Sequence, residues 1–134
     1  MRARLFWLAL FTALILLAGC SSEPKVLGDS SQEGGNVQKV KIGTLHLTFT
    51  RYLDAVIQIE IPFNTRLNTS PREGYVALVS HTEFGKYYIL VHEGLYKDVI
   101  SGLRKDDRIR VFGRVGTAKL PTDDVPRVAL YVDQ

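Results

Sequence analysis

Cysteine is almost missing from this sequence, because its 134 residues include only Cys20. No intrachain disulfide can form, and any site that needs two cysteines is excluded. Long hydrophobic runs are equally scarce, since the one extended run covers residues 5–18 and is never repeated. A chain of this length with 46% hydrophobic residues suits one modest domain and excludes disorder throughout.

Catalytic motifs are missing as well. The chain has no Gly-x-Ser-x-Gly turn, no His-Glu-x-x-His motif and no glycine-rich phosphate loop. The acidic pairs at 106–107 and 123–124 fall in predicted turns, where neighbouring carboxylates rarely converge and are solvated. The sequence therefore predicts a protein that is not an enzyme and that uses no cofactor.

The hydrophobic run has the layout of an export signal. Arg2 and Arg4 precede an apolar core that ends before the small and polar residues at 19–22. A core of about 12 to 14 residues is typical of a signal peptide, whereas a membrane-spanning helix needs roughly 20. The run therefore predicts export followed by cleavage.

The end of this run resembles a known processing site. Its tetrad Leu17-Ala18-Gly19-Cys20 matches, at all four positions, the lipobox of bacterial lipoproteins. The resemblance implies that Cys20 receives a diacylglyceryl group, that residues 1–19 are removed and that the new amino terminus is acylated. Two or more acyl chains hold a protein on a membrane durably, whereas one binds only marginally. The alternatives are a secretory signal with an incidental cysteine and an uncleaved signal anchor.

The residue after Cys20 bears on location. Ser21 resembles the class of lipoproteins sent to the outer membrane, whereas Asp at this position commonly marks retention in the inner membrane. We expect a lipid anchor in the outer membrane that faces the periplasm. In a cell without an outer membrane, the same anchor would hold the protein on the outside of the plasma membrane.

The charge balance gives little attraction to nucleic acid. Removal of residues 1–19 takes away Arg2 and Arg4, which leaves 15 basic residues against 14 acidic ones. A net charge near +1 does not by itself favour a polyanionic partner. We expect an envelope protein or polymer as the partner, with an oligonucleotide as the alternative.

Two regions follow the signal. Residues 20–36 are rich in serine, glycine and charge and lack any apolar period, which predicts a lipidated cysteine followed by a flexible linker. From residue 37 onward, hydrophobic residues alternate with polar ones, which predicts a β domain over 37–134. Its first strand is expected to bend at a bulge at Gly43. The predicted strands cover residues 37–49, 55–63, 75–82, 86–92, 108–115 and 127–132.

Two connections complete this prediction. Glu83-Phe84-Gly85 joins two strands as a hairpin turn, because glycine tolerates positive φ. The spacing of apolar residues between 94 and 103 predicts one short helix, and the polar stretch 64–74 predicts a long loop.

The later part of the domain resembles an OB-fold. Residues 102–115 carry the end of the helix, a turn that reads leucine, basic, acidic, and a strand with Val111, Gly113 and Val115 on one face. The resemblance implies a mainly β protein, with a small OB-like barrel of five or six strands and one short helix. Gly113 would point inward, where a closed barrel needs a residue without a side chain. Another small β-sandwich is the alternative.

Alternation on the last two strands predicts a binding face. Its outward residues are Arg108, Arg110, Phe112, Arg114, Arg127 and Tyr131. OB-folds often bind extended oligomers between their first and last hairpin loops, and here we assign to those loops Arg51, Tyr52 and Lys119. Arginine beside an aromatic ring suits stacking on sugars or bases and pairing with anions. The alternative is an ordinary polar outer face.

The histidines supply a weaker candidate. His81 and His92 are predicted to face each other across the hairpin, where two imidazoles could begin a metal site. No third ligand is evident, so a structural or surface role is favoured and no bound metal is expected. A metal protein or enzyme built around this pair is the third function class.

Overall fold

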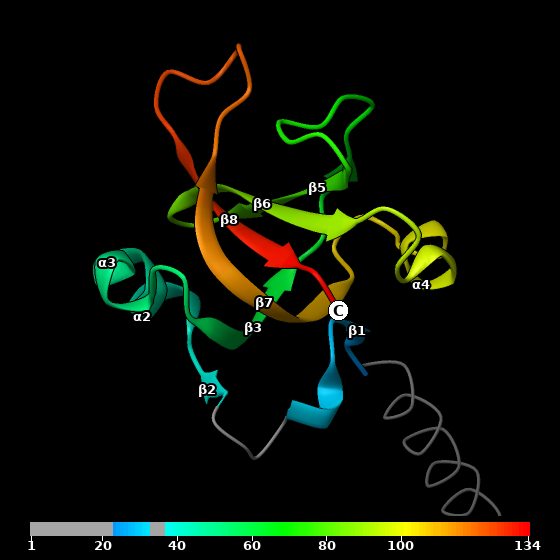
Figure 1. Cartoon of the computed structure of the whole chain (residues 1–134), viewed down its shortest axis with the longest axis horizontal. Coiled ribbons are helices and arrows are strands. Elements are labelled where there is room, and N and C mark those ends of the chain that lie inside the picture. Colours follow the sequence, from blue (N-terminus) through cyan, green and yellow to red (C-terminus); the bar gives the residue numbers. More distant parts are fainter. Residues whose placement is uncertain (1–22, 33–36) are drawn as a thin grey trace, which may run out of the picture.

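Five long strands curve around one interior in the computed structural model, which describes residues 23–32 and 37–134 (Figure 1). The strands of the sheet follow the order β2-β3-β7-β8-β6-β5-β4. The long strands are β3 (Val56–Pro62), β5 (Tyr75–Thr82), β6 (Gly85–His92), β7 (Arg108–Ala118) and β8 (Arg127–Val132).

β7 organises the barrel because its two halves have different partners. Its first half pairs with β3 and its second half with β8, both antiparallel. β8 is parallel to β6, which forms the predicted hairpin with β5. β3 and β5 meet where the Asn64 N–H donates to the Val79 carbonyl oxygen over 2.8 Å. This is the strand order of a small Greek-key OB barrel, so the predicted mainly β, OB-like fold is confirmed.

The interior is filled by the residues that alternation assigned to it. Strand residues at every second position, such as Ile109, Val111 and Leu130, are fully buried. The predicted short helix is confirmed as α4 (Lys97–Ser101), which packs Ile100 into the same core.

The prediction of a bent first strand is wrong. Only β2 (Gln38–Lys39) is a strand there, and it is followed by α2 (Ile42–Leu47) and α3 (Phe49–Tyr52). The stretch carries two apolar periods: Leu45, Leu47 and Phe49 fit a strand, whereas the residues at 42, 45, 49 and 52 fit a helix face. The second set packs on the core, while Leu47 is 80% exposed.

The prediction of a flexible linker is wrong for its middle part. β1 (Lys25–Leu27) pairs in parallel with β7, and Leu27 is fully buried in the main core. A short 3-10 helix, Ser30–Gln32, follows it. The apolar pair Val26-Leu27 is too short to show a period in the sequence, and only the neighbouring edge of β7 makes it a strand.

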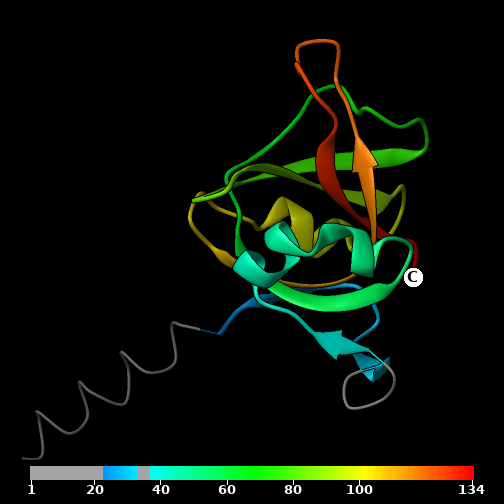
Figure 2. The ribbon, with the colours of Figure 1, turned by 90° about the vertical axis from the view of Figure 1, so that its left-hand side faces the viewer.

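A second apolar cluster covers the outer side of the barrel. It consists of buried residues on β5, β6 and β8, against which Leu67 and Leu120 pack. These two leucines belong to the long loops that follow β3 and β7, and both loops rise at the same end of the barrel (Figures 1 and 2). The β4 strand (Thr65–Arg66) ties the first loop to β5. The cluster residues are Ala77, Val79, Tyr88, Leu90, Ala129 and Tyr131.

Candidate functional site

The side chains of the predicted arginine and aromatic face point outward from the sheet, but its two aromatic rings are not exposed. Phe112 and Tyr131 point to the outer side of β7 and β8, yet each is only 4% exposed. The prediction that these rings are accessible for binding is therefore wrong. Alternation identifies the side of the sheet, but other segments of this chain cover that side.

Phe112 is covered by the turn after β1. Gly28 sits against it with φ of 106°, and a side chain at this glycine would overlap the Phe112 carbonyl oxygen. The turn can approach β7 this closely only because glycine adopts positive φ without strain.

Tyr131 is held by several contacts at once. Its ring lies against Gly116, where an added Cβ would come within 2.8 Å, and its hydroxyl donates to the Thr117 carbonyl oxygen over 2.7 Å. The guanidinium carbons of Arg114 and Arg72 lie 4.7 and 5.7 Å from the ring centroid. These contacts fix the ring as part of the fold.

The arginines of this face are engaged by carboxylates. Arg108 and Arg110 both bind Glu60, at 2.6 and 3.0 Å. Arg114 lies 3.6 Å from Asp133 and 3.9 Å from Asp54. Arg127 is 4.0 Å from Asp123. The four side chains therefore neutralise acids of this chain, which reduces their value for an external anion.

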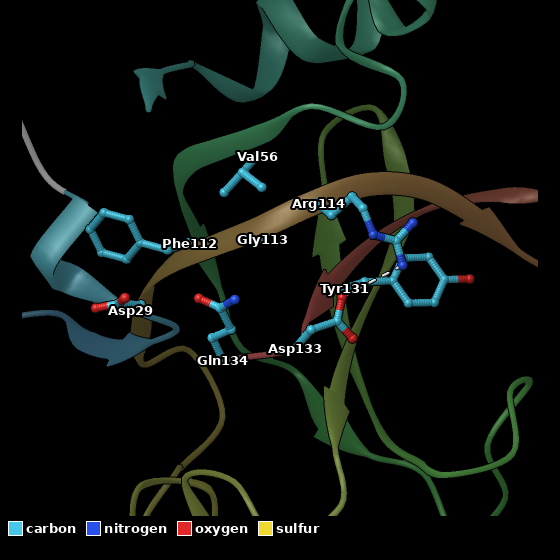
Figure 3. Close-up of a pocket in the computed structure, with 8 residues that line it drawn as sticks. All are labelled: Asp29, Val56, Phe112, Gly113, Arg114, Tyr131, Asp133 and Gln134. Atoms are coloured by element: carbon cyan, nitrogen blue, oxygen red, sulfur yellow. Dashed lines mark ion pairs between the residues drawn. The ribbon is translucent and has the colours of Figure 1, made fainter. Parts of the chain in front are cut away.

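A small hollow remains on this face, with a volume of about 120 Å³ (Figure 3). Arg114 and Asp133 form one wall, with Tyr131 beside them, and Asp29 lies on the other side near Phe112. One cation stands against two carboxylates, so the hollow can hydrogen-bond a small polar group but does not favour an anion. The complete lining is Asp29, Val56, Phe112, Gly113, Arg114, Tyr131, Asp133 and Gln134.

Of the three loop residues predicted for binding, Lys119 lies in its predicted loop, whereas Arg51 and Tyr52 do not lie in a loop of the barrel. Arg51 is exposed on α3, and Tyr52 beside it packs partly on the core. Lys119 is exposed at the start of the β7–β8 loop. The first long loop of the barrel is residues 63–74, not the stretch around Arg51, because two helices occupy the region that was predicted as a strand.

The histidine pair is not a site. In the hairpin register, His81 lies opposite Lys86 and His92 lies opposite Tyr75, so the two histidines stand at opposite ends. The prediction that they face each other is wrong. In residues 23–32 and 37–134, no group of three or more histidine, cysteine or acidic side chains could hold a metal ion.

Asp123 is a buried carboxylate, which corrects the prediction of a solvated turn. It accepts hydrogen bonds from Lys86 Nζ at 2.6 Å, Tyr88 Oη at 2.5 Å and the Leu120 N–H at 2.9 Å. Burial raises the pKa of Asp123, but these donors outweigh it and lower the pKa to about 2. The hydrogen bond between Lys86 and Asp123 raises the pKa of Lys86. Asp123 therefore anchors the β7–β8 loop to β6.

Exposed hydrophobic side chains form a candidate that the sequence did not reveal. Leu47 is the last residue of α2 and is 80% exposed, and Leu53 directly follows α3 and is 48% exposed. Val56, at the start of β3, is exposed as well, and Arg51 lies between them in the chain. We call these four residues the α2–α3 surface. A strand pattern would have buried Leu47, so the pattern of residues contained no sign of its exposure.

Cys20 lies outside the described residues, so its predicted lipidation has no structural counterpart here. Within the part of the chain that the structure describes, no helix is long and apolar enough to cross a membrane.

Comparisons with known proteins bear on the fold. No family model matches the chain, and no curated protein matches it. Among solved structures, it is similar to a candidate aspartyl-tRNA synthetase from Leishmania major Friedlin, with a TM-score of 0.53 and 12% sequence identity. The match covers 90% of this chain but only 25% of the synthetase chain. At this identity the likeness concerns the barrel fold alone.

Proposed function

We propose that the protein is a lipid-anchored lipoprotein of the cell envelope, and that its OB-like barrel is a non-enzymatic binding module for a protein or polymer partner. The observation that carries the proposal is the tetrad ending at Cys20, which directly follows an apolar core of signal-peptide length. Cys20 is the only cysteine of the chain, and acylation explains its position. The expected location is the outer membrane, facing the periplasm.

The α2–α3 surface is the contact site that we propose for the partner. Exposed apolar side chains that are grouped on a small domain commonly mark interaction sites. Leu47 and Leu53 are exposed and lie six residues apart in the chain, and the exposed Arg51 between them adds a residue type that is enriched in interfaces. The predicted site on β7 and β8 has no comparable exposed apolar area, since its two rings are buried.

An oligonucleotide partner is the alternative, favoured by the fold. OB-folds bind oligonucleotides on the outer face of their second and third strands, which here are β5 and β6. That face carries the second apolar cluster, in which Val79, Tyr88 and Leu90 are buried under the two long loops. Because the two long loops cover this face, it is a poor binding surface for a nucleic acid. A salt-dependent shift with single-stranded DNA would support the alternative instead.

Substitution of the acceptor cysteine tests the proposal. Cys20→Ser should block lipid attachment and leave an unprocessed or soluble form, because no other cysteine can take its place. The measurement is metabolic labelling with a radioactive fatty acid, followed by fractionation of membranes. Ser21→Ala is the matched control, since it keeps the acceptor cysteine and should keep the label. A Cys20→Ser protein that still carries the fatty-acid label would contradict the proposal.

A further inference from the structure

The chain between Cys20 and the barrel is short, because β1 already belongs to the barrel. Four residues, 21–24, separate Cys20 from Lys25 at the start of β1. Five residue steps reach at most about 18 Å even when fully extended. A lipid headgroup layer is itself roughly 5 to 8 Å deep. A barrel that is tethered in this way cannot move far from the lipid, and Lys25 stays within about 18 Å of Cys20.

The start of β1 lies at one end of the barrel. Lys25 pairs with Ile109 at the beginning of β7, and the turn 102–107 leads into the same point. Hydrogen bonds join this turn to the end of β3, where the Phe63 N–H donates to the Asp107 carbonyl oxygen over 2.7 Å. Figures 1 and 2 show β1 at the end of the molecule opposite to the β7–β8 loop.

This end presents cations to its surroundings. Lys25, Arg104 and Lys105 are exposed, and among the described residues no ion pair involves them. Two nearby acids are already engaged. The Glu60 carboxylate binds two arginines, and the Asp107 carboxylate accepts the Arg104 N–H over 2.8 Å. Other exposed acids near this end include Glu23, Asp106 and, on α4, which contacts β1, Asp98; α4 also carries the exposed Lys97.

We propose that this end of the barrel, marked by Lys25, Arg104 and Lys105, rests on the headgroups of anionic lipids. The inference rests on the proposed acylation of Cys20, which supplies the tether. Basic residues held next to a membrane are attracted to anionic lipids, and the attraction decays within a Debye length. A fully extended tether keeps Lys25 within roughly 10 to 13 Å of the headgroup surface, which is one to two Debye lengths. The β7–β8 loop then points away from the membrane.

Distance measurements on the full lipidated chain test this orientation. An acylated Cys20 has no free thiol, so one introduced cysteine takes a fluorophore uniquely. Pro62→Cys and Pro121→Cys form a matched pair, because both residues are exposed and uncharged. Pro62 pairs with Arg108 at the β1 end, whereas Pro121 lies in the β7–β8 loop beyond the other end of β7. The two ends of β7 lie up to about 33 Å apart along the strand.

The labelled proteins are placed in vesicles of phosphatidylethanolamine and phosphatidylglycerol that carry an acceptor dye on the headgroups. We expect energy transfer from position 62 to be several-fold stronger than from position 121. Equal transfer from an acylated protein would overturn the orientation alone. A mass spectrum that shows no acyl group on Cys20 would overturn the lipoprotein proposal and the orientation with it.

A charge reversal tests the role of the cations. Arg104→Glu with Lys105→Glu should reduce transfer from position 62 in these vesicles, and added salt should reduce it in the unreversed protein. Lys119→Glu is the matched control, because Lys119 is exposed near the far end of β7 and should leave transfer unchanged. Unchanged transfer in the reversed protein would contradict the contact with anionic headgroups.

Discussion

For a single residue, the direction of the side chain and its exposure to solvent are different properties, as Phe112 and Tyr131 show. Both point to the outer side of their strands, as alternation predicts, and both are buried. Direction follows from the pleat of a single strand, whereas exposure depends on what else lies over that strand. The Gly28 turn covers Phe112, and Tyr131 lies between Gly116 and two arginines.

Asp123→Asn should lower the free energy of unfolding by about 1 to 3 kcal/mol, because a buried acceptor of three hydrogen bonds loses its charge. The folded-state pKa of about 2 lies below the ordinary value of 3.8, so the charged form is stabilised by folding. This stability is fully present above pH 4 and disappears as the pH falls toward 2.

Urea unfolding at several pH values measures this effect. Asp124→Asn is the matched control, because Asp124 is the exposed neighbour and should change stability little. An Asp123→Asn protein as stable as the wild type at neutral pH would show that the hydrogen bonds do not hold the loop.

Gly113→Val should destabilise the barrel by roughly 1 to 3 kcal/mol through overpacking. An added Cβ would lie 3.2 Å from the Tyr131 carbonyl oxygen and 3.4 Å from the Leu130 Cβ, before the two methyl groups of valine are counted. Thermal unfolding of the whole chain checks the effect, and Gly113→Ala should cost less. An unchanged melting temperature in the valine variant would mean that β7 shifts to make room.

At the scale of elements, the two errors of prediction share one cause. The stretch 42–52 fits either a strand or a helix period, and residues 25–27 are too few to show a period at all. Contacts elsewhere decide both: α2 and α3 place their apolar face on the barrel core, and β1 completes an edge of β7. Strand β3 and the hairpin, whose patterns allow one interpretation, were predicted correctly.

The role of β1 can be tested with two leucines. Leu27→Ala should cost about 2 to 5 kcal/mol of stability, because it leaves a cavity beside β7 in the main core. Leu47→Ala removes the same atoms from a side chain that is 80% exposed and should cost little. Denaturant unfolding compares them. Equal stabilities would show that β1 is not part of the folded barrel.

For the whole molecule, the proposals are consistent with one orientation of the barrel relative to the membrane. In the proposed orientation, the short tether to Cys20 places the β1 end toward lipid, and the β7–β8 loop lies at the opposite end (Figure 1). The outer face of β5 and β6 is closed by loops of the same chain. The exposed apolar side chains near α2 and α3 are therefore the surface that we propose for a partner in the envelope.

The double variant Leu47→Ser, Leu53→Ser should be nearly as stable as the wild type but should bind the proposed partner more weakly. Leu47 is 80% exposed and Leu53 about half exposed, so folding should lose little, whereas a true hot spot can cost about 2 kcal/mol of binding. A photo-crosslinker at Thr50, which is exposed on α3, captures the partner in intact cells. Val125→Ser is the control, because Val125 is 54% exposed in the β7–β8 loop. Equal capture of the partner by both variants would show that the partner binds elsewhere on the protein.

Features that depend on covalent order and short-range pattern could be predicted from the order of the amino acids. These are the apolar run that precedes Cys20, the near-balanced charge, the hairpin, α4 and the inward residues of β7 and β8. Tertiary structure alone decided that β1 joins the barrel, that residues 42–52 are helical and that the loops close the outer face. The reason is physical: periodicity records which side of an element is apolar, whereas burial and ion pairing depend on segments that are distant in the chain.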